Sequence, residues 1–412
     1  MPELLIAGGR VFDGTGAAPR AADVLVRDGR IASVGAPGSV AAADGAARIN
    51  ATGKLVLPGL IDCHVHLTST SEANAELRRL KDTIPLQALR GADNARKMLM
   101  AGFTTVRDLS APGWSNIAIR DAINQGLCVG PRVLAAGMSL TVPGGHGDNY
   151  YRPEVHVFRE GLVNGADSAR LAVREAIRMH ADVIKLLVTG GVMTDGSDVG
   201  AIQWTDDELH AAIDQAHQLG RRVAGHCHGG GGVKAAVRLG LDTVEHGTML
   251  DAEAIDLIGS RGAFLVPTLV ASQNIVSNGL KAGIAPHVVR KAEEVAEWHR
   301  RSVHDAYAAK IKIAFGTDCG TPFNRPGENG SELGLMMLQG FSAADALIAA
   351  TRVAADAIGL SDQIGTLEAG KRADVIVVDG DPLADISVLA DGSRVSWVVR
   401  DGAVVKRPEV AA

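Results

Sequence analysis

Short apolar stretches rich in valine, isoleucine and leucine recur along the chain, each followed by a polar or glycine-containing turn and an alanine-rich amphipathic stretch. The apolar stretches are residues 60–66, 103–109, 133–140, 183–189, 222–228, 243–246, 263–269 and 311–318. Helical periodicity fills the segments between them, as in 207–219 and 288–310. Strands that alternate with helices predict an α/β fold with a parallel sheet covered on both faces. Eight such strands are the number that closes a (β/α)₈ TIM barrel.

Both ends of the chain have a different pattern from the middle. Residues 4–49, 373–379 and 395–406 alternate between apolar and polar positions and are interrupted by Asp-Gly pairs, which favour tight turns. This pattern predicts a small, β-sandwich-like domain built from residues 1–57 and 361–412, flanking a barrel at 58–360. The alternative is two independent hairpins that decorate the barrel.

Composition limits the classes of function. The 412 residues include 46% hydrophobic residues, enough for a large core, and the net charge of −6 with 3% aromatic residues argues against a nucleic-acid partner. No apolar run approaches the roughly 18 residues that a membrane span needs. Four scattered cysteines form no CxxC pair, and the N-terminus has no signal-peptide pattern, so we expect a cytoplasmic protein without disulfides.

Residues that bind metals or protons stand at the ends of the predicted strands. His64 and His66 are two positions apart, so both side chains face the same side of the first strand. The other strand-end residues are Lys185, His226, His246 and Asp318. Because the carboxyl ends of barrel strands surround one mouth, these six side chains are expected to converge. Imidazole and carboxylate groups are good Zn²⁺ ligands, so the set predicts a catalytic metal site.

Lys185 needs a separate explanation, because an ammonium group would be repelled by a metal ion. A neutral lysine amine can add CO₂ to give a carbamate, which is able to bridge two metals about 3.5–4 Å apart. The alternative is that Lys185 reaches the surface or pairs with Asp182.

Several of these segments resemble the amidohydrolase superfamily. The motifs that carry the resemblance are Val56-Leu57-Pro58-Gly59-Leu60-Ile61-Asp62-Cys63-His64-Val65-His66, Ile184-Lys185-Leu186 with Thr189-Gly190-Gly191, Glu245-His246-Gly247, Gly316-Thr317-Asp318 and Gly370-Lys371-Arg372-Ala373-Asp374. Together they span nearly the whole chain. The most similar subgroup is that of the imidazolonepropionase-like and prolidase-like enzymes, which hydrolyse dipeptides and N-acyl amino acids.

The resemblance implies a ligand set for two divalent metal ions, expected to be Zn²⁺. His64, His66 and Asp318 would hold one ion, His226 and His246 the other, and carboxylated Lys185 would bridge them. Imidazolonepropionases bind a single metal and lack the bridging lysine, so the presence of Lys185 argues against that activity.

Asp318 and His228 are the residues expected to act in catalysis. Metal binding lowers the pKa of water towards about 7, so a bridging hydroxide is expected at neutral pH. Asp318 would take the proton of this hydroxide and deliver it to the leaving amine. His228, two residues after His226 and on the same face, is placed to donate a hydrogen bond to the developing oxyanion. The alternative is that His228 only lines the mouth.

Substrate contacts are expected from loops at the same mouth. His146 follows the third strand in a glycine-rich loop, and the resembled subgroup has a substrate-contacting histidine there. Arg152 and Arg325 are competing candidates to bind a substrate carboxylate through the planar guanidinium group. For both arginines the alternative is a solvated loop residue.

Other suggestive residues are given no chemical role. Cys63, Cys227 and Cys319 each adjoin a proposed ligand, but strand alternation directs them into the layer between barrel and helices. Glycines 229–232 lack the Lys-Ser/Thr of a phosphate loop. The histidines outside the strand ends are also assigned no function: His156, His180, His210, His217, His287, His299 and His304.

The sequence thus predicts a binuclear metal-dependent amidohydrolase that cleaves the amide bond of a dipeptide or an N-acyl amino acid, a small-molecule substrate. The alternatives are a lactonase or phosphotriesterase on the same metal core, a hydrolase of a xenobiotic amide, and a non-catalytic scaffold. The complete ligand set argues against the scaffold. Association into a homo-oligomer is also expected.

Overall fold

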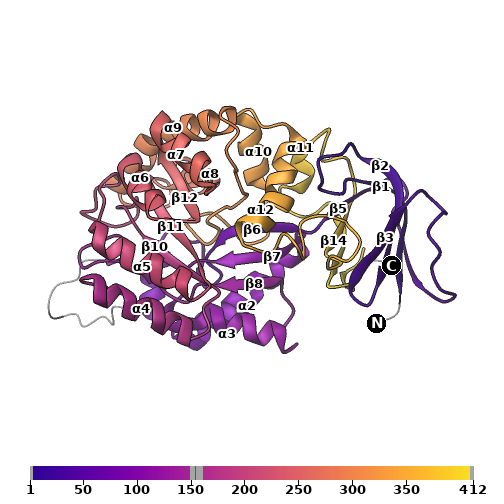
Figure 1. The fold of residues 1–412 in the computed structure, drawn as a ribbon, viewed down its shortest axis with the longest axis horizontal. Helices are drawn as coiled ribbons and strands as arrows, with labels where there is room; N and C mark the ends of the chain where they lie inside the picture. The colour runs from indigo at the N-terminus through magenta and orange to yellow at the C-terminus, as the bar shows by residue number, and fades with distance from the viewer. Residues whose placement is uncertain (1–2, 149–153, 155–160, 409–412) are drawn as a thin grey trace.

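Strands from the two ends of the chain pair with one another. The computed structural model describes residues 3–148, 154 and 161–408. One sheet contains β1 (Leu4–Val11), β2 (Arg20–Arg27), β3 (Arg30–Gly35), β4 (Ala47–Asn50), β5 (Leu55–Pro58), β14 (Val375–Val378), β15 (Val395–Arg400) and β16 (Ala403–Lys406). Its order is β16-β15-β14-β5-β1-β2-β3, with β4 paired to β1. The strands form one continuous ladder rather than two separate sheets, and the sheet lies at one end of the molecule (Figure 1).

Two of the predicted Asp-Gly turns connect strands of this sheet. Asp28 and Gly29 join β2 to β3 with φ of 50° and 75°, and Asp401 and Gly402 join β15 to β16 with φ of 48° and 78°. Positive φ at both central positions is the geometry whose twist matches a two-residue hairpin, and Asp-Gly tolerates it. These turns therefore set the register of both hairpins.

The rest of the chain alternates parallel strands with helices. One parallel sheet has the order β6-β7-β8 and a second has the order β13-β12-β11-β10-β9. Their strands are β6 (Leu60–Val65), β7 (Phe103–Asp108), β8 (Arg132–Ala135), β9 (Ser139–Leu140), β10 (Val183–Leu187), β11 (Arg222–Gly229), β12 (Thr243–Met249) and β13 (Phe264–Val266). The strands are almost entirely buried, as expected for a parallel sheet with helices on its faces.

Helices pack around these strands and contribute their apolar faces to a large core. The helical segments are α1 (Ala75–Lys81), α2 (Ile84–Met100), η1 (Pro112–Trp114), α3 (Ser115–Asn124), α4 (Ala166–Arg178), α5 (Asp206–Gln218), α6 (Gly230–Arg238), α7 (Ala252–Arg261), α8 (Leu269–Asn278), α9 (Pro286–Ala308), α10 (Ser331–Leu338), α11 (Ala343–Ile348), η2 (Ala349–Val353), α12 (Ala354–Ala357) and η3 (Ile386–Leu389). Helix α5 begins with a capping box between Thr205 and Glu208. Among the described helices, none is both long and apolar enough to cross a membrane.

Two predicted strands differ from the observed ones. The stretch 133–140 is divided into β8 and β9, with Gly137 at φ 73° between them. The stretch 311–318 is not a continuous strand, because it forms an isolated bridge between Ile313 and Leu265 instead of a ladder, and it ends at Asp318 with φ 57°. The segment 311–318 still forms backbone hydrogen bonds to both parallel sheets. The amide of Ala314 donates to Leu265 O on β13 at 2.8 Å, and the amide of Asp318 donates to His64 O on β6 at 2.7 Å.

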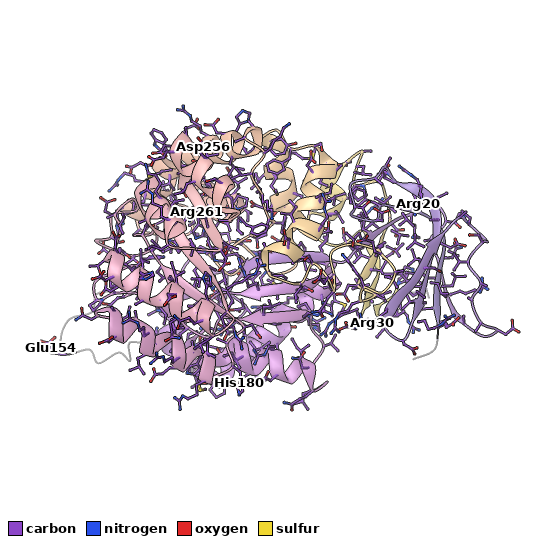
Figure 2. The ribbon with its side chains drawn as sticks, viewed as in Figure 1. Arg20, Arg30, Glu154, His180, Asp256 and Arg261 are labelled. Carbon is purple, nitrogen blue, oxygen red and sulfur yellow. The ribbon has the colours of Figure 1, made fainter. Side chains whose placement is uncertain are left out.

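Charged side chains project outward around this core. Figure 2 labels Arg20 and Arg30 on the terminal strands and Asp256 and Arg261 on α7, all of which are exposed. The charges that matter for chemistry are buried at the ends of the parallel strands instead.

Candidate active site

The first two predicted ligands lie at the end of β6 and meet Asp318. Alternation along the strand buries Cys63 and Val65 in the core and turns His64 and His66 to the other face. The Nε2 atoms of His64 and His66 lie 3.4 Å and 3.1 Å from Asp318 Oδ1. The hydrogen bond from the Asp318 amide to His64 O fixes this approach from the backbone. The structure therefore brings these three residues together, as the motifs predict.

A second group comes from β11 and β12. The Nε2 of His246 lies 2.9 Å from the Nδ1 of His226, and the rings of His228 and His246 stack with centroids 4.9 Å apart. Two sets of ligand atoms lie within 4.8 Å of one another among the described residues: one set is His226, His228 and His246, and the other is His64, His246 and Asp318. His246 belongs to both sets, and His228, expected to bind an oxyanion, lies in the set with His226.

Each of these imidazoles has a partner for the nitrogen that faces away from the shared centre. The partners are Glu245 Oε2 for His64 at 2.9 Å, Ser110 O for His66 at 3.2 Å, Gly190 O for His226 at 3.2 Å, Thr248 Oγ1 for His228 at 2.6 Å and Thr268 Oγ1 for His246 at 2.7 Å. Such outer contacts fix ring orientation and tautomer, and the other nitrogen of each ring is directed to the shared centre, where those of His226 and His246 contact each other. The arrangement suits metal coordination.

Lys185 lies on β10 beneath this centre. Its side chain is only 2% exposed, and its Nζ has no hydrogen-bond partner among the described residues. Burial, opposed by the carboxylates of Glu245 and Asp318, lowers the pKa of Lys185 to about 8. The alternatives of a surface lysine and of a pair with Asp182 do not match this position, because Asp182 accepts a hydrogen bond from Arg120 instead.

Electrostatics keep most of the histidines neutral. Burial lowers the pKa of His64 to about 4 and of His228 to about 3, and it holds the pKa values of His226 and His246 well below the ordinary range. Burial raises the pKa of Asp318, but His64 and His66 outweigh it and hold that pKa below its ordinary value. At neutral pH the site therefore presents imidazole lone pairs and a carboxylate, the forms that bind cations.

A buried ion pair supports the centre from behind and was not predicted. Arg107 Nη2 on β7 donates to Glu245 Oε1 at 2.7 Å, while the other oxygen of Glu245 contacts His64. Arg107 Nε also donates to Cys63 O at 2.6 Å. Both charged residues are at most 1% exposed. Arg107 and Glu245 each lie within an apolar stretch of the sequence, and charged residues are seldom buried unless they are paired. This position was the sequence signal that could have indicated the ion pair.

The side chains of the predicted site line one cavity of about 320 Å³. All six predicted metal ligands border it, as do His146 and His228. The His146 ring stacks on His226 with centroids 4.4 Å apart, and its Nδ1 lies 2.7 Å from Thr194 Oγ1. Gly191 makes this possible, because a Cβ there would lie 2.3 Å from the His146 ring.

His299 also borders the cavity, although the sequence analysis assigned it no role. It lies on α9, and its Nε2 is 3.1 Å from His246 O. Helical spacing places it on the same face as Ala292 and Val295, which are buried. The helical spacing of His299 from these apolar residues is the sequence signal that could have indicated its inward position.

Of the two arginines predicted to bind a substrate carboxylate, only Arg325 can be compared with the cavity lining, and it is not part of it. Arg152 lies outside the described residues, and Arg325 is exposed. Arg79 and Arg90, from α1 and α2, border the cavity instead. The sequence analysis assigned neither of them a role.

The cysteines next to the ligands are packed in the core. Cys63, Cys227 and Cys319 are fully buried, and burial raises the pKa of each thiol far above its ordinary value. Neutral buried thiols are poor nucleophiles and poor metal ligands. Their placement agrees with the packing role that strand alternation predicts.

The amidohydrolase family model matches residues 55–405 of the chain. The chain belongs to the amidohydrolase family. Ochratoxinase from Aspergillus niger is 30% identical over 433 residues, covering 98% of this chain and 87% of that protein. This membership makes the chain a hydrolase that acts on amide bonds, and it confirms the resemblance drawn from the motifs.

Solved structures of similar proteins point the same way. A Xaa-Pro dipeptidase with methionine bound in its active site superposes with a TM-score of 0.91 and 34% identity, covering 98% of this chain and all of that chain. A prolidase complexed with N-methylphosphonate-L-proline superposes with a TM-score of 0.90 and 33% identity, with the same coverage. The prolidase-like part of the predicted resemblance is thereby confirmed.

Proposed function

We propose that this chain is a binuclear metal-dependent amidohydrolase that cleaves the amide bond of dipeptides or N-acyl amino acids. The observation that carries the proposal is the cavity where five ligand-type side chains converge around a buried lysine amine that has no hydrogen-bond partner among the described residues. The names of the ochratoxinase, dipeptidase and prolidase relatives support an amide as the bond that is cut.

The residues present fit two divalent cations, for which we propose Zn²⁺. The four ligand histidines have their outer nitrogens bonded, and their inner nitrogens contact one another or Asp318 at the centre, where a cation would take the place of these contacts. A carbamate on Lys185 would replace a buried positive charge with an anionic metal ligand. It would thereby account for the lack of a hydrogen-bond partner for Nζ among the described residues. When bound, such metals supply Lewis acidity and lower the pKa of water towards neutrality.

The chain's own residues account for proton movement and orientation. Asp318 is ionised at neutral pH and is proposed to accept the proton of the attacking water and pass it to the leaving amine. His228 is proposed to donate a hydrogen bond to the carbonyl oxygen as negative charge develops, with its ring held by Thr248. His146, held by Thr194, is proposed to contact substrate.

The finer fold assignments are proposals of the same kind. We propose that β6–β13 and the segment 311–319 close into the expected (β/α)₈ barrel, since this segment bonds to β13 on one side and β6 on the other. Residues 1–57 and 361–412 are proposed as the separate β domain, which is supported by their shared sheet and their own buried cluster.

The unpaired cysteines support a cytoplasmic location. The homo-oligomer is to be tested by light scattering.

The test is turnover by protein purified with zinc and bicarbonate. Dipeptides, N-acyl amino acids, lactones and phosphotriesters would be supplied, with released amine or acid identified by mass spectrometry and bound metal counted by elemental analysis. Hydrolysis of the carboxylate-bearing amides with two metals per chain is the expected result. Turnover restricted to lactones or phosphotriesters, or of no substrate by protein holding two metals, would overturn the substrate class.

A further inference from the structure

The cavity wall has two chemically different parts. One part is apolar and joins the buried cluster around Ile275 and α9. Its lining residues are Leu187, Val192, Met193, Ala271, Ile275 and Val295. The other part is polar and comes from the loop after β6 together with α1 and α2. Figure 1 shows α2 and α8 on opposite sides of the parallel strands.

The polar part is held rigidly. Arg90 Nη1 donates to Thr68 O at 3.2 Å, and its Nη2 donates to the Asp82 carboxylate in a largely buried ion pair. Gln87 Nε2 donates both to Arg79 O at 3.1 Å and to Asp82 O at 2.9 Å. The end of α1 is therefore fixed to α2 through its backbone, and the Arg90 side chain keeps a defined position. The Arg79 side chain is exposed and borders the cavity from this fixed end of the helix.

This part of the wall carries an uncompensated positive charge. Asp82 neutralises Arg90, and Glu72 pairs with Arg78, the neighbour of Arg79. Among the side chains that the structure describes, none forms an ion pair with Arg79. Two guanidinium groups with one carboxylate leave a net charge of +1 at the cavity wall, which complements one anionic group of a ligand.

We infer that Arg79, assisted by Arg90, binds the substrate carboxylate, and that the apolar part of the wall receives an apolar acyl group. The inference rests on the proposed function and refines it: the substrate class is an amino acid whose nitrogen carries an aliphatic or aromatic acyl group. A guanidinium group suits this role because its planar N–H groups match both carboxylate oxygens. The metal-ligand residues border the same cavity, so an amide that links the two groups would reach them.

The experiment compares two substrates and two neighbouring arginines. N-hexanoyl-L-leucine and its C-terminal carboxamide have nearly the same size and shape, but the carboxamide has no negative charge and carries an NH₂ donor in place of one carboxylate oxygen. Arg79→Gln removes the proposed contact, and Arg78→Gln is the matched control, because Arg78 lies on the same helix and is not among the residues that line the cavity. The wild-type preference for the carboxylate in kcat/KM should fall about 10- to 100-fold in R79Q, through KM, and stay unchanged in R78Q.

Binding to metal-free protein separates this inference from the proposed function. Calorimetry should show that R79Q, but not R78Q, binds N-hexanoyl-L-leucine about 10- to 100-fold more weakly than wild type. If wild type binds this compound but does not hydrolyse it, the proposed function fails while the carboxylate site stands. If R79Q keeps the wild-type preference and affinity, if R78Q loses them equally, or if wild type binds neither compound, the carboxylate site is refuted.

Discussion

Replacing Lys185 with methionine should stabilise the metal-free protein and at the same time abolish its function. The folded protein buries the ammonium group without a partner, and the pKa of Lys185 is lowered from 10.5 to about 8. At about 1.4 kcal/mol per pKa unit, this shift corresponds to about 3 kcal/mol of lost stability. Methionine has a similar length and no charge, so Lys185→Met removes that cost.

The sign of the pH dependence follows from proton binding. Between about pH 8 and pH 10.5 the unfolded chain holds a proton on Lys185 that the folded chain has released, so wild-type stability rises with pH in this window. The advantage of Lys185→Met should therefore be about 3 kcal/mol at pH 7 and should disappear above about pH 10.5.

The assay is urea unfolding of protein stripped of metal and kept free of CO₂, followed by circular dichroism. Lys281→Met, at an exposed lysine, is the control and should change stability by no more than about 0.5 kcal/mol. Elemental analysis after zinc and bicarbonate are added should find two metals in wild type and at most one in Lys185→Met. A Lys185→Met protein that is no more stable than wild type at pH 7, or that keeps two metals and full activity, would refute the reasoning.

Three further substitutions test the surroundings of Lys185. Arg107→Met leaves the Glu245 carboxylate buried without compensation and should cost about 3–5 kcal/mol in urea unfolding; a loss below 1 kcal/mol would contradict this. Asp318→Asn removes the proposed proton acceptor and should lower kcat by about 10²- to 10⁴-fold in steady-state assays, so near-normal kcat would exclude that role. Thr268→Val removes the hydroxyl bonded to His246 and should weaken zinc binding about 10- to 100-fold in chelator competition, whereas Thr268→Ser should not.

The sequence predicted well those features that depend on local periodicity. Buried parallel strands form continuous apolar runs, so most strands and the residues at their ends were placed correctly, including His64 and His226. The segment before Asp318 was less predictable, because its left-handed backbone at Asp318 does not follow from apolar character. It is set instead by hydrogen bonds to strands distant in sequence.

The features that depend on tertiary contacts could not be predicted in the same way. The sharing of His246 between two groups of ligand atoms depends on distances across the cavity. Arg79 and Arg90 border the cavity from two helices whose connection is held by Gln87 and Asp82. The sequence analysis chose Arg152 and Arg325, in loops at the predicted mouth, because the helical periodicity of α1 and α2 does not show which of their residues border a cavity.

The buried charges around the site are explained better by function than by stability. A buried ion pair such as Arg107 with Glu245 can often be replaced by apolar residues of similar volume with no loss of stability, or with a gain. Here, however, Glu245 also holds the Nδ1 of His64, and Arg107 holds the backbone oxygen of Cys63 beside it. Replacing both charges together with apolar residues should therefore restore stability lost in the single variant but release His64, so that folding and metal affinity would respond in opposite directions.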